Sequence, residues 1–280
     1  MSAERFAPHR AFLVRLAYRM LGSIAEAEDI VQDAYLRWQA APTDVVVEPR
    51  AYLARIVSRL CLDRMKSAQA RRESYVGTWL PEPVIEPPAE SLANDLSVAL
   101  LLTLERLSPL ERAAFLLHDV FDMDYAEVAS TLDRSEAACR QLAARARDHV
   151  RDERPRFTPN PGATARLGEA FLRAMTTGDV AAFSTMLAED AILYTDGGGK
   201  RLAALNPIYG RDKIIRFFVG IAAKNPLPLP EHVDATTING VPGFVVHSED
   251  GPETLSFEID GDRIVAIYAV RNPDKLKHLS

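Results

Sequence analysis

Residues 124–151 read DYAEVASTLDRSEAACRQLAARARDHVR, the pattern of two short helices joined by a polar turn. Asp124 and Glu127 have the spacing of a capping box, in which two side chains satisfy the free N–H groups at the start of a helix. The break falls at 133–135, where Asp and Ser favour turns, so Ser135 is expected to cap the second helix. Such a pair predicts a helix-turn-helix, whose second helix enters the major groove of DNA.

At 100° per residue the second helix of this pair is amphipathic. Its expected inner side gathers Cys139, Leu142, Ala143, Ala146 and Val150. The N-terminal residues of such a helix meet base edges, where Arg suits guanine and Gln suits adenine. The candidate base readers are Glu136, Ala137, Arg140 and Gln141, and the candidate phosphate contacts are Arg145, Arg147 and Arg151. The alternative is a helical hairpin with a solvated basic face.

Length and composition place the chain among ordinary globular proteins. Its 280 residues are 48% hydrophobic and 26% charged, enough for two or three domains. Cys61 and Cys139 fall on apolar helix faces far apart, so we expect reduced core thiols and a cytoplasmic protein. The apolar run 96–104 is too short to span a bilayer. We expect no membrane association, no cofactor and no metal.

Charge is unevenly distributed along the chain, whose net charge is −6. Residues 1–72 hold 12 basic and 8 acidic residues, whereas residues 73–98 hold no basic and 5 acidic residues. The basic excess therefore lies in the first block, where a nucleic-acid partner would be favoured.

The first block is predicted to be helical, beginning with a capping box at Ser23 and Glu26. The helix that follows has an inner face made of Ala27, Ile30, Val31, Ala34, Tyr35 and Trp38. Its outer face carries Glu26, Glu28, Asp29, Gln32 and Asp33. This acidic face is either simply solvated or a surface for a basic partner.

A second helix is predicted at about 50–69, with Leu53, Ile56, Val57 and Leu60 on its buried side. Arg55, Arg59 and Lys66 fall on the opposite side, as a stripe that could follow a phosphate backbone. The neighbouring aromatic residues Tyr52, Tyr75 and Trp79 either stack on unpaired bases or pack in the core.

These segments together resemble a known family. Residues 27–37, AEDIVQDAYLR, resemble the signature of region 2 of bacterial sigma-70 factors, and residues 52–57 with Asp63 and Arg64 resemble the segment that follows it. The helix-turn-helix resembles region 4. Their order and spacing are similar to those of the small extracytoplasmic-function (ECF) sigma factors.

The resemblance implies partners and roles for particular residues. Glu28, Asp29, Gln32 and Asp33 would bind the basic coiled coil of the β′ subunit of core RNA polymerase. Arg55, Arg59, Asp63 and Arg64 would lie at the minus-ten element of promoter DNA. Glu136, Ala137, Arg140 and Gln141, with Arg145 and Arg147, would bind the minus-thirty-five element.

The expected domains are sigma region 2 at 1–72 and sigma region 4 at 99–154. Between them, residues 73–98 form a proline-rich acidic linker, and residues 155–162 form a second linker before a domain at 163–280. Residues 79–83, WLPEP, are more apolar than a solvated spacer requires. They either dock on another domain or reflect local packing of Trp79.

The last domain is predicted to be α+β, because helices precede an antiparallel meander. Helices are expected at 163–175, 180–188 and 211–223, and strands at 191–195, 232–238, 243–248, 253–259 and 263–270. This order resembles the SnoaL-like branch of the NTF2-like cone fold. The glycines of residues 196–200, DGGGK, favour a flexible or tightly turned connection.

Three motifs match the ECF subgroup that carries a fused C-terminal SnoaL-like domain: residues 79–83, 196–200 and 272–276. The resemblance implies an interdomain regulatory role for these segments and a contact between the C-terminal domain and the sigma domains. The residues concerned are Trp79, Leu80, Pro81, Asp196, Gly197, Gly198, Gly199, Lys200, Asn272, Pro273 and Asp274.

Two functions are weighed. The first is a non-enzymatic sigma factor that binds core polymerase and directs promoter-specific initiation, with its own C-terminal domain controlling its activity. The alternative is a DNA-binding protein fused to a catalytically active SnoaL-like isomerase or hydrolase. Its acid–base candidates are Tyr194, Asp196, Tyr209, His247 and Glu258, in a pocket that could also hold a small-molecule ligand.

Overall fold

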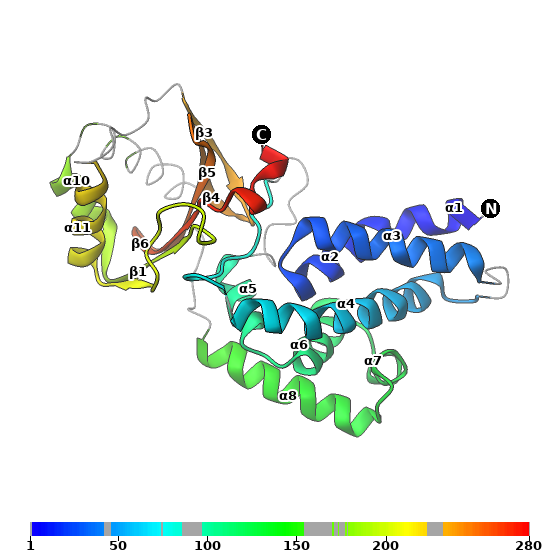
Figure 1. Cartoon of the computed structure of the whole chain (residues 1–280). Coiled ribbons are helices and arrows are strands. Elements are labelled where there is room, and N and C mark those ends of the chain that lie inside the picture. The colour runs from blue at the N-terminus through cyan, green and yellow to red at the C-terminus, as the bar shows by residue number, and fades with distance from the viewer. Residues whose placement is uncertain are drawn as a thin grey trace. The chain divides into compact units, whose positions relative to one another are not determined.

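The computed structural model (Figure 1) describes residues 2–41, 46–73, 75–85, 97–153, 170, 173, 177, 179–222 and 232–279. The chain divides into two compact units, which are described separately. Unit 1 comprises Met1–Ser74 and Ala99–Arg154, and unit 2 comprises Tyr75–Val98 and Pro155–Ser280. The expected linker at 155–162 and most of the expected helix at 163–175 lie outside the described residues.

The first half of unit 1 is helical: α1 (Ser2–Phe6), η1 (Ala7–His9), α2 (Arg10–Leu21), α3 (Ile24–Ala40) and α4 (Pro49–Glu73). Gly22 ends α2 because its backbone is left-handed, with φ 70°. The Ser23 side chain caps α3 by accepting a hydrogen bond from the Glu26 N–H group at 3.2 Å. Trp38 of α3 and Leu53 of α4 are fully buried in the core between these helices.

The second half of unit 1 contains α5 (Val98–Glu105), α6 (Pro109–Phe115), η3 (Leu116–Val120), α7 (Tyr125–Leu132) and α8 (Glu136–Glu153). The expected capping box of Asp124 and Glu127 is present at the start of α7. Asp133, with φ 56°, ends α7, and the Ser135 hydroxyl accepts from the Ala138 N–H group at the start of α8. The predicted helix-turn-helix is confirmed.

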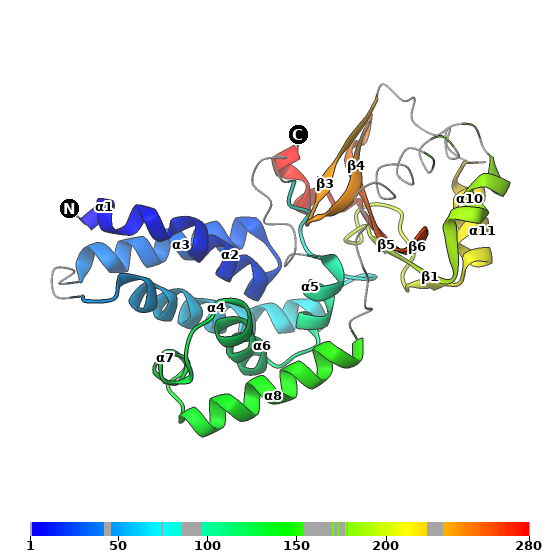
Figure 2. The same ribbon diagram turned by 180° about the vertical axis from the view of Figure 1, so that it is seen from behind.

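Unit 2 is built on a six-stranded sheet in the order β2-β1-β6-β5-β4-β3. Its strands are β1 (Leu187–Asp196), β2 (Ile208–Tyr209), β3 (Val233–Ile238), β4 (Val241–Ser248), β5 (Gly251–Asp260) and β6 (Arg263–Val270). The expected antiparallel meander runs from β3 to β6, whereas β1 pairs with β6 in parallel. Helices α10 (Val180–Met186) and α11 (Arg211–Ala222) lie beside β1 (Figure 2). The α+β prediction is confirmed.

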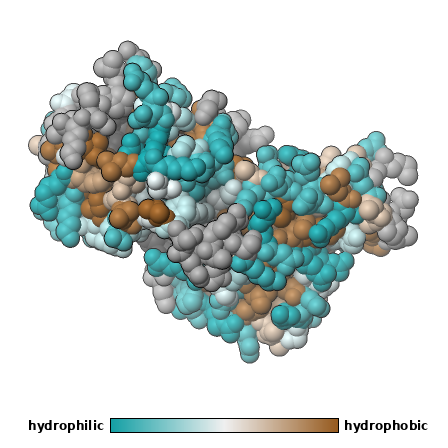
Figure 3. Space-filling model, in the orientation of Figure 1, coloured by the Kyte–Doolittle hydropathy of each residue, from teal (hydrophilic) through white to brown (hydrophobic). Residues whose placement is uncertain are grey.

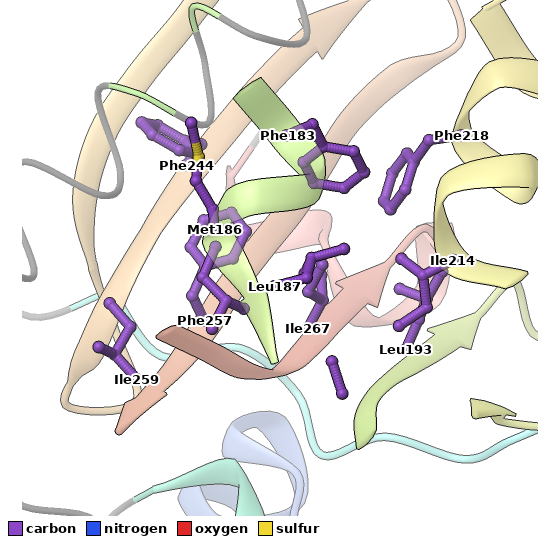
Figure 4. Packing of buried hydrophobic residues seen from close by; sticks show 12 residues of the cluster. Phe183, Met186, Leu187, Leu193, Ile214, Phe218, Phe244, Phe257, Ile259 and Ile267 are labelled. Carbon is purple, nitrogen blue, oxygen red and sulfur yellow. The ribbon is translucent and has the colours of Figure 1, made fainter. Parts of the chain in front are cut away.

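The hydrophobic core of unit 2 lies between these helices and one face of the sheet (Figure 4). Phe183 of α10 meets Phe218 of α11 edge to face, with ring centroids 5.4 Å apart. Leu193, Phe257 and Ile267 contribute from β1, β5 and β6. Because side chains alternate along a strand, the residues next to these three belong to the opposite face of the sheet.

The visible surface is mostly hydrophilic, with apolar residues in scattered groups (Figure 3). In the part of the chain that the structure describes, we find no helix long and apolar enough to cross a membrane. The same residues contain no group of three or more His, Cys, Asp or Glu side chains that could hold a metal ion.

Candidate nucleic-acid interface

The four candidate base readers lie together on the exposed side of α8. Cys139, Ala143 and Ala146 are fully buried against the rest of unit 1, which turns the first residues of the helix outward. Arg140 Nη2 forms an ion pair with Glu136 Oε2 at 2.6 Å, and both side chains are about half exposed. The exposed candidate readers are Glu136, Ala137, Arg140 and Gln141.

Tyr125, which sequence reasoning did not select, lies under this cluster. The Arg140 guanidinium carbon is 5.1 Å from the centroid of the Tyr125 ring. His118 stacks on the same ring at 3.9 Å, and Arg147 donates to the Tyr125 hydroxyl at 2.5 Å. Tyr125 lies 15 positions before Arg140, on another helix, so no helical periodicity connects them.

Arg145 and Arg147, the candidate phosphate contacts, have intramolecular partners. Arg145 Nε donates to Glu111 Oε1, and Arg147 Nε donates to Asp119 Oδ1, both at 2.7 Å. The hydrogen bond from Arg147 to Asp119 raises the pKa of the guanidinium. Burial alone would raise the pKa of the Glu111 carboxyl, but hydrogen bonds from Ser108 and Arg145 lower it. The role of Arg145 and Arg147 as phosphate contacts stays a prediction.

The candidate minus-ten residues lie on α4, where Arg55 and Arg59 meet α7. Arg55 Nη1 donates to the Ser130 hydroxyl, and Arg59 Nε donates to the Thr131 carbonyl, each at 3.4 Å. Further along α4, Asp63 pairs with Lys66 at 3.0 Å. Arg64 lies 3.7 Å from Glu26 of α3. The structure therefore brings two candidate minus-ten arginines into contact with the first helix of the helix-turn-helix.

An aromatic contact holds the two halves of unit 1 together. Phe121, which follows η3, packs edge to face on Phe12 of α2 with ring centroids 5.1 Å apart. The Arg19 guanidinium lies 5.0 Å from the Phe121 ring, and Arg50 donates to the Phe121 carbonyl at 3.4 Å. Phe121 thus occupies a socket made of residues from the first half.

Arg112 of α6 makes a buried contact between the same halves. Its side chain is 1% exposed and donates to the carbonyls of Met20 at 2.6 Å and Leu104 at 2.7 Å, as well as to the Glu105 carboxylate at 2.7 Å. Burial lowers the pKa of the Arg112 guanidinium to about 9, so it is charged at neutral pH.

The acidic face of α3 is exposed. Glu28 lies 3.5 Å from Arg10, and both side chains are more than half exposed. Leu36, 56% exposed, follows Gln32 by four positions and Asp33 by three, so it lies on the same surface. This face therefore combines negative charge with one apolar side chain, and its exposed polar residues are Glu28, Asp29, Gln32 and Asp33.

In unit 2, the Asp196 carboxylate joins the segment 75–85 to the C-terminal sheet. Its side chain is fully buried and accepts hydrogen bonds from the Tyr75 hydroxyl at 2.6 Å and the Leu80 N–H group at 2.9 Å. It also accepts from the Gly198 N–H group at 3.0 Å and from Lys275 Nζ at 2.6 Å. The contact with Lys275 compensates the charge.

The other two motifs contribute to the same network. Asn272 donates to the Tyr75 hydroxyl at 2.8 Å. A Cβ atom on Gly198, whose φ is 61°, would lie 2.3 Å from Asn272, so only glycine fits this turn. At the edge of the network, Lys200 and Asp274 form an exposed ion pair at 2.5 Å. The tight turn expected at residues 196–200 is present.

The segment Tyr75–Ile85 packs along the C-terminal part of unit 2. Lys275 Nζ lies 4.2 Å from the Trp79 ring and donates to the Leu80 carbonyl, and Leu80 is fully buried. The Val84 N–H group donates to the Asn239 side-chain oxygen, and the Asn239 N–H group donates to the Val84 carbonyl. Of the two interpretations of residues 79–83, the structure supports docking, here on the C-terminal part of unit 2.

The acid–base candidates do not face the core cluster of unit 2. Glu258 follows the core residue Phe257, so it lies on the opposite face, where it accepts from the Tyr268 hydroxyl at 2.7 Å. Tyr194 stacks on the Tyr268 ring, with centroids 5.4 Å apart. His247 pairs with Asp234 at 3.0 Å, and Tyr209 is 58% exposed. The sequence alone does not say which face of each strand is covered by the helices. The structure does, and strand alternation then places these candidates on the opposite face.

Two family models match the halves of unit 1. The model of sigma-70 region 2 matches residues 6–71, and the model of sigma-70 region 4 matches residues 97–150. The first match includes the acidic helix α3 and the arginines of α4. The second includes the helix-turn-helix.

Similar proteins cover both units. The ECF RNA polymerase sigma factor SigJ of Mycobacterium tuberculosis is 38% identical over 98% of this chain and 93% of its own length. The crystal structure of M. tuberculosis SigJ matches with a TM-score of 0.81 and 34% identity, over 99% of this chain and 98% of that one. The probable ECF sigma factor SigI of M. tuberculosis is 38% identical over 61% of this chain and 62% of its length. The chain belongs to the ECF RNA polymerase sigma factor family.

Proposed function

We propose that this sigma factor binds core RNA polymerase through the exposed acidic face of α3 and binds promoter DNA through α4 and α8. The exposed arrangement of Glu136, Arg140 and Gln141 at the start of α8 is the observation that carries the proposal. These side chains face outward from a helix whose other side is core, as readout in the major groove requires. Transcription would place the protein in the cytoplasm.

Charge and exposure support α3 as the polymerase-binding surface. Glu28, Asp29 and Asp33 present negative charge to solvent, which suits the basic coiled coil of the β′ subunit. Leu36 would add apolar contact area in the middle of this charged surface. The partner stays a proposal for this chain.

Promoter binding requires the two halves of unit 1 to separate. Arg55 and Arg59 of α4 are hydrogen-bonded to α7, so in this arrangement they are not available to the minus-ten element. The two promoter elements also lie apart on the DNA, whereas α4 and α7 are in contact. Core polymerase, or a ligand of the C-terminal domain, would select a separated state.

The C-terminal domain would control this change through the segment 75–85. This segment connects α4 to α5 along the chain and is docked in unit 2 through Asp196, Asn272 and Lys275. Docking shortens the free chain between the halves of unit 1, which limits how they can be placed on a promoter. The network residues named by the three motifs would thus regulate activity without touching DNA.

The alternative function, an active SnoaL-like isomerase or hydrolase, is not favoured. Its carboxylate candidates are engaged elsewhere: Asp196 binds Lys275 and the docked segment, and Glu258 accepts from Tyr268 on the face away from the core cluster.

Run-off transcription with purified core polymerase tests the proposal. The full chain and a version ending near Pro159 are compared on candidate promoters. Initiation by either establishes sigma activity, and the difference between them shows whether the C-terminal domain activates or inhibits. Failure of both proteins to initiate, despite core binding and a promoter to which the full chain binds, would contradict the proposal.

The docking surface is tested by a double charge reversal, Asp29→Lys with Asp33→Lys, measured as affinity for core polymerase. We expect at least a tenfold loss, because two attractive contacts become repulsive. Asp260→Lys with Asp262→Lys, an exposed double reversal at the β5–β6 turn, is the matched control and should leave affinity unchanged. Equal affinities of the two variants would argue against α3 as the surface.

A further inference from the structure

Tyr125 connects both helices of the helix-turn-helix to η3, at the place where the base-reading residues begin. It is the first residue of α7, it stacks on His118 of η3, and its ring lies 5.1 Å from the Arg140 guanidinium of α8. Its side chain is only partly buried. A residue that served only as core would be enclosed, whereas the Tyr125 ring lies beneath an exposed arginine.

The Tyr125 ring is itself held in place by polar contacts. Its hydroxyl accepts from Arg147 at 2.5 Å, and Arg147 in turn donates to Asp119 at 2.7 Å. His118 Nδ1 lies 2.8 Å from the Met123 carbonyl, which fixes the imidazole that stacks on the ring. Each neighbour of the ring therefore has a second contact that restricts its movement.

Arg140 is restricted from two directions as a result. The Tyr125 ring supplies a cation–π surface, and the Glu136 carboxylate, 2.6 Å away and one turn earlier, binds the guanidinium at one edge. An exposed arginine otherwise samples many rotamers, and it loses that freedom when it forms two parallel hydrogen bonds to a guanine. Prior restriction lowers this cost and favours one orientation of the fork.

We propose that Tyr125 is a positioning residue for base readout: together with Glu136 it orients the Arg140 guanidinium toward one base pair of the upstream promoter element. The inference rests on the proposed function, in which Arg140 reads a base. It adds a specificity role for a residue of α7 that acts through Arg140. Arg147 acts through Tyr125 in this arrangement.

The test measures base preference with full-length protein and core polymerase. Promoter templates randomised in the upstream element are selected by binding and sequenced, and Arg140→Ala identifies the base pair whose preference Arg140 supports. Tyr125→Leu, which removes the ring, should lower the preference at that pair about two- to fivefold, as expected for an exposed cation–π contact. Preferences at the other positions should not change.

Two comparisons separate positioning from a general loss of structure. Tyr125→Phe keeps the ring and removes only the hydroxyl, so it should restore most of the preference lost in Tyr125→Leu. In an Arg140→Ala background, Tyr125→Leu should have no further effect on the preference at that pair, because the group it positions is gone.

The outcomes distinguish the inference from the proposed function. If Arg140→Ala changes no base preference, the reading role fails and the inference fails with it. If Arg140→Ala abolishes a preference that Tyr125→Leu retains, only the positioning role is wrong. Should Tyr125→Leu not fold, Glu136→Gln tests the other side of the clamp, with an expected loss of about twofold at the same base pair. An unchanged preference in Glu136→Gln would then overturn the inference.

Discussion

Each unit contains one docked contact, and the two contacts differ in how their polar groups are buried. In unit 2, the segment 75–85 is held by the fully buried Asp196 carboxylate, whose four hydrogen bonds are 2.6 to 3.0 Å long. In unit 1, Arg50, Arg55 and Arg59 join the two halves through hydrogen bonds of 3.4 Å. Only Arg112 makes a comparably buried polar contact among those described between the halves.

The difference indicates which contact is suited to open. Separating the segment 75–85 would remove two hydrogen bonds from the Asp196 carboxylate and one acceptor from Lys275, and would expose their buried ion pair to water. We expect this to cost several kcal/mol, because hydrogen bonds to buried charged groups are among the strongest. Separating the halves of unit 1 releases long hydrogen bonds that water can replace, one aromatic contact and the hydrogen bond from Arg112 to the Met20 carbonyl. Arg112 keeps its contacts with Leu104 and Glu105 in the same half. The sigma halves are therefore expected to open while the segment stays docked.

The largest effect is expected for Asp196→Asn. Removing one charge from a buried pair leaves Lys275 uncompensated, so the free energy of unfolding of unit 2 should fall by about 3 to 5 kcal/mol. Chemical denaturation monitored by Trp79 fluorescence in a Trp38→Phe background measures this. Asp274→Asn in the neighbouring motif is the control, because its side chain is half exposed. A loss below 1 kcal/mol in Asp196→Asn would remove the contrast between the two contacts.

Phe121→Ala tests the weaker contact. Deleting a buried phenyl ring should weaken the association between the halves of unit 1 by about 3 kcal/mol, because the socket formed by Phe12 and Arg19 is left empty. Spin labels at the exposed positions Gln39 and Ala144 should then report longer distances. Val150→Ala, a core change within one half, should leave the distances as they are. Unchanged distances in Phe121→Ala would mean that Arg112 and the arginines of α4 hold the halves together without this aromatic contact.

Tyr75→Phe sharpens the comparison through pH. Burial, followed by the hydrogen bond to Asp196, raises the pKa of the Tyr75 hydroxyl well above its ordinary value of 10. The folded state therefore holds this proton more tightly than the unfolded state. The resulting stability is complete below pH 10 and is lost as pH rises further.

The variant should lose about 1 to 2 kcal/mol at neutral pH, because Asn272 and Asp196 lose a hydrogen-bond partner. Its difference from the unmodified protein should shrink above pH 10, measured by urea denaturation from pH 8 to 11. A difference that stays constant over this range would show that the Tyr75 hydroxyl is not linked to folding.

The smallest effect is expected for the ion pair of Lys200 and Asp274, despite its 2.5 Å separation. Lys200 lowers the pKa of the Asp274 carboxyl, so its small contribution is present at neutral pH and is lost as pH falls. Both side chains are about half exposed and screened by solvent. Lys200→Met should cost well under 1 kcal/mol, and the loss should vanish at high salt. A loss of stability above about 1 kcal/mol would mean that solvent exposure does not distinguish the weak Lys200–Asp274 pair from the strong Asp196–Lys275 pair.

Local patterns in the sequence were sufficient for the helices of unit 1. Ser23 and Asp124 cap helices as predicted, because capping depends on residues three positions apart. The candidate base readers Arg140 and Gln141 follow from the same local pattern. Tyr125 could not be found this way, since its contact with Arg140 crosses from one helix to another.

In unit 2, β1 illustrates what sequence reasoning missed. Its expected bounds, 191–195, are shorter than the strand at 187–196, and its parallel pairing with β6 was not predicted. Pairing between segments more than 70 residues apart leaves no local signal, because it depends on how the chain returns to the sheet. The placement of Glu258 on the face opposite the core cluster likewise depends on which face of β5 the helices cover.

The sequence by itself determined the family, the helix-turn-helix and the acidic and basic faces, because these depend on spacings within one helix or turn. Only the tertiary structure decided that Asp196 holds the segment 75–85, that Arg55 and Arg59 contact α7, and that Tyr125 supports Arg140. Each of these contacts joins residues far apart in the chain, and a side chain's partner there depends on packing rather than on its neighbours in sequence.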